Sequence, residues 1–161
     1  MNVLLALILV APVTEAPDVR TSLRLPHSAQ DLVLEYRQIE DDLAAFVQPA
    51  GLSGHELQKL RVQALLVQQA AFSCDVEFRN DETRFGPGRR PLGFTVDPGG
   101  VVRFFLVDGR DAVPIVSEPV ETDERSPRLV MNLEYVDRAE ARITWRLGDR
   151  AGTIVLKLGA A

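Results

Sequence analysis

The chain has a single cysteine, Cys74, in 161 residues and therefore cannot close a disulfide within itself. It offers no Cys-x-x-Cys pair for metal or redox chemistry. Histidine is nearly as scarce, with only His27 and His55, whereas a closed zinc site needs three or four protein ligands. We therefore predict no metal and no cofactor, and we expect the fold to depend on its hydrophobic core.

Catalytic motifs are also missing. The sequence has no Gly-x-Ser-x-Gly elbow, no glycine-rich loop followed by lysine and no His-Glu-x-x-His. A thiol dyad would have to use Cys74, which falls on the apolar side of an alternating pattern where a thiol behaves as a small hydrophobe. Carboxylate pairs such as Asp75 and Glu77 fall on a polar face instead. We predict no catalytic residue and favour a non-catalytic protein.

The sequence lacks the positive charge that nucleic-acid binding requires. Its formal net charge is −5 and its pI is near 5.1, which gives no overall basic field to neutralise phosphates. Lysine occurs only at Lys59 and Lys157, so the cations are almost all arginine. We expect no nucleic-acid partner.

Only one continuous apolar run stands out, over residues 3–11, and it ends at Pro12. The run is shorter than the about 20 residues of a membrane-spanning helix and has the length of a signal-peptide core. The sequence therefore predicts a signal peptide over residues 1–16, a periplasmic or secreted protein, and no membrane span in the mature chain. No Lys or Arg precedes the run, and Pro17 would follow the cleavage site. The alternatives are therefore a buried strand of a cytoplasmic protein and an uncleaved anchor.

Residues 17–27 contain Pro17 and Pro26 and are expected to be a linker. Two segments with helical spacing follow, each opened by a serine that has an acidic residue three positions later. Pro49 and Gly51 separate the two segments. The sequence predicts an α-hairpin over about residues 28–71. The apolar positions are Leu32, Tyr36, Ile39, Leu43 and Phe46 in the first helix, and Leu57, Leu60, Ala64, Val67 and Ala71 in the second.

From Phe72 onward the apolar period changes to two, which is typical of half-buried strands. The alternation is clearest over residues 72–79, 129–135, 141–147 and 154–158. Short turn signals connect most of these segments, so neighbouring strands should be antiparallel. We predict an antiparallel sheet of about six or seven strands over residues 72–158. The expected fold class is α+β, in one domain over residues 28–161.

The stretch 80–91 is polar, contains Gly86-Pro87-Gly88 and is expected to be a long loop. Arg84, Phe85, Arg89 and Arg90 lie in it. Guanidinium groups bind carboxylates and phosphates through paired hydrogen bonds, and these four residues are our candidate binding surface for an acidic partner. The competing interpretation is a solvated loop whose Phe85 packs on the sheet.

The leading functional hypothesis is a non-catalytic exported protein of the envelope or medium. It would bind a protein partner through a sheet edge or through the 80–91 loop. One alternative is a carrier of an apolar small molecule in a cavity between the sheet and the helices, lined by Phe104, Leu133 and Trp145. A second alternative is a small hydrolase that uses carboxylates or Cys74.

Overall fold

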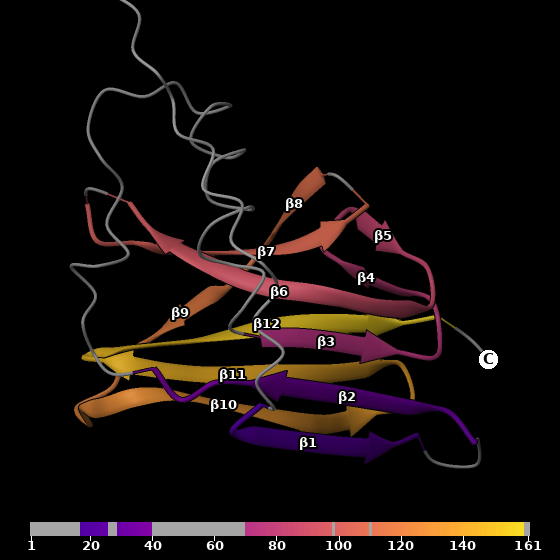
Figure 1. The fold of residues 1–161 in the computed structure, drawn as a ribbon, viewed down its shortest axis with the longest axis horizontal. Coiled ribbons are helices and arrows are strands. Elements are labelled where there is room, and N and C mark those ends of the chain that lie inside the picture. The colour runs from indigo at the N-terminus through magenta and orange to yellow at the C-terminus, as the bar shows by residue number, and fades with distance from the viewer. Residues whose placement is uncertain (1–16, 26–28, 40–69, 98, 110, 160–161) are drawn as a thin grey trace, which may run out of the picture.

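The computed structural model describes residues 17–25, 29–39, 70–97, 99–109 and 111–159 (Figure 1). Over these ranges the chain forms twelve strands and no helix. The predicted α+β class is therefore wrong, because the described part of the chain is all-β.

Six antiparallel strands form the first sheet, in the order β1-β2-β3-β6-β7-β8. The chain visits this sheet twice, first through β1 to β3 and later through β6 to β8. The strands are β1 (Val19–Arg24), β2 (Asp31–Tyr36), β3 (Ala70–Cys74), β6 (Gly88–Val96), β7 (Val102–Asp108) and β8 (Asp111–Ile115).

The second sheet has the order β10-β11-β12-β4-β5, and β9 also pairs with β12. One side of β12 is paired with β11, and the other side is shared by β9 and β4. The strands are β4 (Phe78–Asn80), β5 (Thr83–Phe85), β9 (Glu118–Val120), β10 (Ser126–Asp137), β11 (Glu140–Gly148) and β12 (Arg150–Leu158).

The two sheets bury their apolar faces in one shared core, as a β-sandwich does (Figure 1). Phe104 of the first sheet meets Trp145 of the second, with ring centroids 5.1 Å apart. Phe72 meets Phe78 edge to face at 5.3 Å, again across the two sheets. Each of these side chains is at most 5% exposed. Burying a side chain of this size contributes about 1.5–3 kcal/mol, so the shared core is the main source of stability.

The start of the predicted α-hairpin is a strand, β2. Leu32, Leu34 and Tyr36 are buried, whereas Val33 and Glu35 are half-exposed, which is a period of two. Leu32 and Tyr36 are four positions apart, which fits one face of a helix. Residues separated by an even number of positions also share one face of a strand, so the same pair fits β2. Residues 40–69, which make up most of the predicted hairpin, lie outside the described residues.

The single strand predicted over residues 72–79 is two strands in different sheets. β3 ends at Cys74 and β4 begins at Phe78, so the chain crosses from one sheet to the other between them. The apolar alternation continues across this break because Phe72, Cys74 and Phe78 all enter the shared core. The one predicted sheet is consequently two.

The predicted long loop over residues 80–91 is also wrong, because β5 and the start of β6 occupy it. The antiparallel pairing predicted for neighbouring strands is confirmed. Val96 pairs with Val102 in a hairpin closed by the turn that contains Gly100, whose φ is 80°. β10, β11 and β12 form an antiparallel meander that contains the alternating segments 129–135, 141–147 and 154–158.

Residues 1–16 lie outside the described residues, and the signal peptide stays a prediction. In the described ranges we find no helix with the length and apolarity needed to cross a bilayer.

Candidate binding surface

The three predicted arginines do not converge on one point. Arg84 lies on β5 of the second sheet, whereas Arg89 and Arg90 lie on β6 of the first. Each is within ion-pair distance of a different carboxylate of the chain. The pairs are Arg84–Glu77 at 4.0 Å, Arg89–Glu35 at 3.2 Å and Arg90–Asp108 at 3.2 Å. A clamp formed by all three guanidinium groups is therefore not present.

Phe85 and Arg90 belong to the internal packing of the sandwich. Phe85 is 1% exposed and stacks on Phe78 with centroids 5.0 Å apart. The guanidinium carbon of Arg90 lies 5.7 Å from the Phe85 ring, a cation–π distance, and its Nη1 donates to the carbonyl of Gly86 at 2.8 Å. These contacts fix the turn from β5 to β6. The interpretation in which Phe85 packs on the sheet is the one that the structure bears out.

A different group of cations lies on the outer face of the second sheet. Arg84 is directly opposite Arg79 on β4, and Arg79 is directly opposite Lys157 on β12. All three residues are exposed. We call Arg84, Arg79 and Lys157 the cationic row. Like charges directly opposite each other on neighbouring strands destabilise a sheet, and Glu77 beside Arg84 and Glu140 beside Lys157 offset part of this repulsion.

Glu140 of β11 continues the row, because it pairs in register with Lys157. Its carboxylate accepts hydrogen bonds from Lys157 Nζ and, at 2.7 Å, from Arg142 Nε. The bond from Lys157, followed by that from Arg142, holds the pKa of Glu140 below its ordinary value. Glu140 is thus an anion at neutral pH that positions two cations, and it is unsuited to act as a general acid.

A groove of about 570 Å³ lies beside the row, between the β4–β5 turn and the β8–β9 link. Asn80 forms part of it and is 3% exposed. The Asn80 amide accepts from Val116 N at 2.6 Å and donates to Val116 O at 3.1 Å and Val155 O at 3.0 Å. The amide thereby joins β4, β12 and the β8–β9 link. Arg79, Arg142 and Lys157 also line the groove, together with acidic residues of its rim, Asp81, Glu82 and Glu118.

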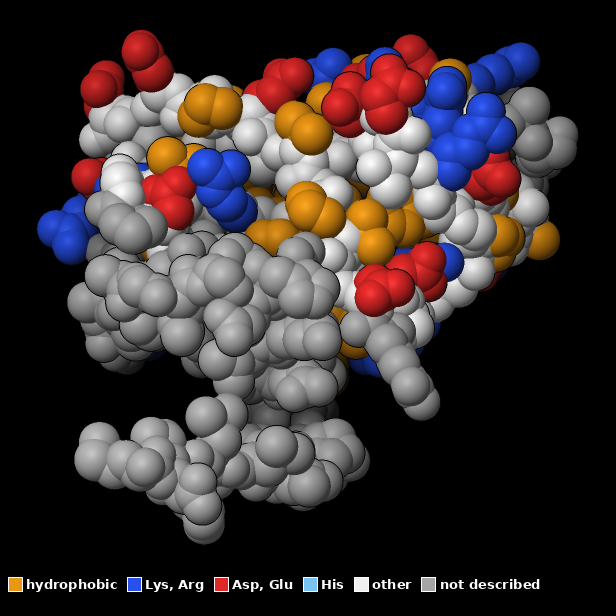
Figure 2. Space-filling model, turned by 90° about the horizontal axis from the view of Figure 1, so that it is seen from above, with side chains coloured by type: hydrophobic (Ala, Val, Ile, Leu, Met, Phe, Trp, Pro, Cys, Tyr) orange, Lys and Arg blue, Asp and Glu red, His pale blue; other side chains and the backbone are white. Residues whose placement is uncertain are grey.

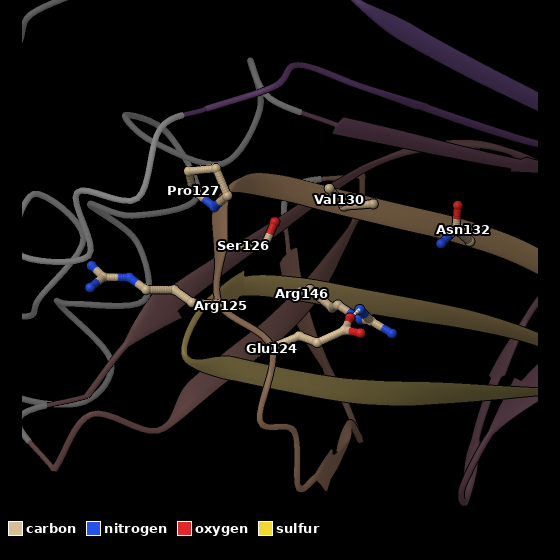
Figure 3. A pocket seen from close by; sticks show the side chains of 7 residues that line it. All are labelled: Glu124, Arg125, Ser126, Pro127, Val130, Asn132 and Arg146. Carbon is tan, nitrogen blue, oxygen red and sulfur yellow. Dashed lines mark hydrogen bonds and ion pairs between the residues drawn. The ribbon is translucent and has the colours of Figure 1, made fainter.

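A second hollow, of about 330 Å³, lies over β10 and β11 (Figure 3). Glu124 and Arg146 form an ion pair in it. Arg125 points away from the other labelled side chains in Figure 3, and Asn132 lies well along the strand from them. The polar groups of this hollow do not face a common point, so it is the weaker binding candidate.

The view from above shows basic and acidic side chains close to one another, with apolar side chains between them (Figure 2). No large area of one charge dominates this face. A charged binding site on this face would therefore depend on a local arrangement of side chains.

The thiol that a catalytic dyad would use lies in the core. Cys74 is 1% exposed, and its burial raises the pKa of the thiol, which keeps it protonated. No group of three or more His, Cys, Asp or Glu side chains suited to a metal occurs in the described part of the chain. His27 and His55 lie outside it.

No protein-family model, curated protein or solved structure matches this chain.

Sequence reasoning missed this row for a definite reason. Arg79 and Lys157 are far apart in the chain, and only the pairing of β4 with β12 brings them together. The pairing of Arg79 with Arg84 could have been predicted from the sequence. On both sides of a short turn, exposed residues alternate with less exposed ones, which are Phe78, Asn80, Thr83 and Phe85. The glycines and proline that follow favoured a loop instead.

Proposed function

We propose that the protein is a non-catalytic, exported binding module that docks a protein partner of the cell envelope on the cationic row. Arg79 is the observation that carries this proposal. It lies between two cations, and among the described residues it makes no ion pair of its own. An anion that approaches Arg79 would relieve the repulsion between it and its two neighbours.

The sheet edges support a partner less well than this outer face does. β8 contains Pro114, which has no amide proton to donate to an added strand. β5 is only three residues long. At the other side of the sandwich β1 lies beside β10, and Leu129 N already donates to Ile39 O at 2.8 Å. Such features are typical of edges that are protected against pairing.

Neither alternative function gains a specific observation. The side chains that would line a carrier cavity, Phe104, Leu133 and Trp145, are buried in the shared core, where the Phe104 and Trp145 rings contact each other. The hydrolase needs an activated nucleophile, and Cys74 is buried with a raised pKa.

Site-specific photo-crosslinking in the native host tests the docking surface. A photoreactive residue replaces Arg79 in one version of the full chain and Arg128, an exposed arginine of β10, in the control. We expect position 79 to give one reproducible adduct with an envelope protein and position 128 to give none. Adducts from position 128 alone, or from neither position, would overturn the proposal.

Export is tested on the same material by intact mass and fractionation. A mass that corresponds to loss of about residues 1–16 in an extracytoplasmic fraction is the expected result. Full-length protein in the cytosol would contradict it.

A further inference from the structure

We infer that residues 40–69 of this chain pack on the outer face of the first sheet, which is the face turned away from the shared core. The surface that they would contact is an area of small or apolar residues on three neighbouring strands, which we call the outer patch. Its residues are Ala71 on β3, Pro91, Gly93 and Thr95 on β6, and Phe105 and Val107 on β7. The inference does not rest on the proposed function, because the cationic row belongs to the second sheet.

The register of the first sheet brings the outer patch together. Ala71 pairs with Pro91, and Gly93 pairs with Phe105. Phe94, the next residue of β6, is part of the shared core. Because successive residues of a strand alternate between its two faces, the residues on either side of Phe94 belong to the outer face. The patch is therefore continuous across β3, β6 and β7.

The centre of the outer patch is buried, although no described strand lies over it. Ala71 is 5% exposed, Thr95 is 1% exposed, and Gly93 is buried as well. All twelve described strands belong to the two sheets, and these meet through their other faces. The strands themselves do not supply the cover, which points to a further segment of the chain.

Thr95 shows that the cover is apolar. Its hydroxyl oxygen is buried and has no hydrogen-bond partner among the described residues. A threonine on a solvated outer face would keep its hydroxyl hydrated, whereas burial without a partner is unfavourable. Apolar contacts around Thr95 have to compensate for this loss. A water-filled or strongly polar surrounding would instead have satisfied the hydroxyl.

The outer face of the second sheet differs in kind from the outer patch. Its middle strands carry exposed charged residues, which are Glu134 on β10, Arg142 and Arg146 on β11, and Lys157 on β12. The two inner faces already fill each other in the shared core. The outer patch is consequently the sheet surface that suits an apolar segment.

Residues 40–69 have the composition that such a cover needs. Fourteen of these 30 residues are Ala, Val, Leu or Phe, and only six are charged. Large apolar side chains in this number are unfavourable in water and need an apolar surface to contact. The apolar residues are densest over residues 62–67, which have the sequence Val-Gln-Ala-Leu-Leu-Val.

The attachment of this segment places it within reach of the outer patch. It rejoins the described chain at Ala70, the first residue of β3, which precedes Ala71 of the patch and pairs with Leu92 of β6. Thirty residues can extend over about 100 Å. The three strands of the patch span only about 10 Å across the sheet, so even a compact arrangement of the segment is long enough.

The inference has a consequence for recognition by other molecules. If residues 40–69 occupy the outer face of the first sheet, a partner cannot use that face. The outer face of the second sheet then remains as the broad sheet surface on which a partner can dock.

Intramolecular photo-crosslinking of the full chain tests the occupant. Benzoylphenylalanine, a photoreactive analogue of phenylalanine, replaces the half-exposed Phe105 in one version and Thr144, on the outer face of the second sheet, in the control. The purified protein is irradiated at low concentration, digested and mapped by mass spectrometry. We expect position 105 to give an adduct with a peptide from residues 40–69 at the mass of a single chain, and position 144 to give none.

Other crosslinking results would overturn the inference. A covalent dimer from position 105 would show that a second copy of the chain covers the patch. An adduct that forms only in a cell lysate would show that a separate partner does so. An absent adduct, or equal adducts with residues 40–69 from positions 105 and 144, would show that this segment does not pack specifically on the patch.

A pair of smaller substitutions tests the cover without a bulky probe. Thr95→Val removes the buried hydroxyl and keeps the shape of the side chain, so we expect the urea midpoint of unfolding to rise. Thr144→Val, at a half-exposed position of the second sheet, is the matched control and should shift the midpoint less. A lower midpoint in Thr95→Val, or equal shifts in the two variants, would mean that Thr95 faces water and would contradict the inference.

Discussion

At the scale of single residues, Gly152 shows how tightly the sandwich is packed. An ideal Cβ at this position would lie 2.7 Å from Trp145 Nε1 and 2.8 Å from the backbone oxygen of Glu118. We expect Gly152→Ala to lower the free energy of unfolding by about 1–3 kcal/mol, since the backbone of β9 cannot easily move away. Urea denaturation followed by the fluorescence of the single tryptophan measures this.

Gly86→Ala is the matched control for that measurement. A Cβ at Gly86 has no neighbour within 4 Å, and the substitution should change the free energy of unfolding by less than about 0.5 kcal/mol. Equal effects of the two substitutions would show that the contact of β12 with Trp145 is looser than described.

Glu140 predicts a dependence of stability on pH. Its pKa in the folded protein lies below the ordinary value of 4.5, so the unfolded chain binds the proton more readily. The stabilisation by Glu140 is therefore complete above about pH 4.5 and is lost as the pH falls through the folded pKa. We expect Glu140→Gln to be less stable than the parent at pH 7 and to lose less stability on acidification. Urea midpoints at pH 7 and pH 3 test this, and a parallel pH profile for the two proteins would contradict it.

At the scale of strands, β12 depends on Asn80. The three hydrogen bonds of its amide fill the place between β9 and β4, where neither strand pairs with β12. Asn80→Ala leaves three part-buried backbone groups without these partners and should lower the free energy of unfolding by about 1–3 kcal/mol. Hydrogen exchange at the Val116 amide should accelerate. The exposed Asn132→Ala is the control, and comparable exchange in both variants would refute the role of Asn80.

At the β5–β6 turn, the neighbouring residues Arg89 and Arg90 are expected to contribute differently to the stability of the fold. The Arg90 side chain is 12% exposed and contacts Asp108, Gly86 and the Phe85 ring, whereas the Arg89 side chain is 63% exposed. Arg90→Ala should cost about 1–3 kcal/mol through lost packing and hydrogen bonds. Arg89→Ala should cost about 0–1 kcal/mol, as exposed ion pairs do. Thermal unfolding of the two variants measures these losses of stability. A larger loss in Arg89→Ala than in Arg90→Ala would contradict these contacts.

The strands that sequence alone predicts well are those with a long alternation and a short turn. The meander β10 to β12 and the hairpin of β6 with β7 are of this kind, because local pattern and local pairing agree. For β2 the sequence predicts a helix, because Leu32 and Tyr36 satisfy both periods. For β5 it predicts a loop, because this strand is three residues long and precedes Gly86-Pro87-Gly88.

At the scale of the whole molecule, what sequence cannot supply is the sheet to which each strand belongs. Both inner faces meet in one core, so alternation looks the same in β3 of the first sheet and β4 of the second. For the same reason, the cationic row cannot be predicted from the sequence alone. Arg84 was selected from its local composition, but its neighbours Arg79 and Lys157 follow only from the register of three strands.

The rate at which a thiol reagent labels the buried Cys74 reports how often the folded protein opens. β3 lies inside the first sheet, between β2 and β6, and burial keeps the thiol protonated. A thiol reagent can therefore react only during the brief intervals when the sheet opens, and each chain can take up one label. The labelling rate should rise with urea in step with unfolding, and it would report the lifetime of the closed sandwich without any engineered probe.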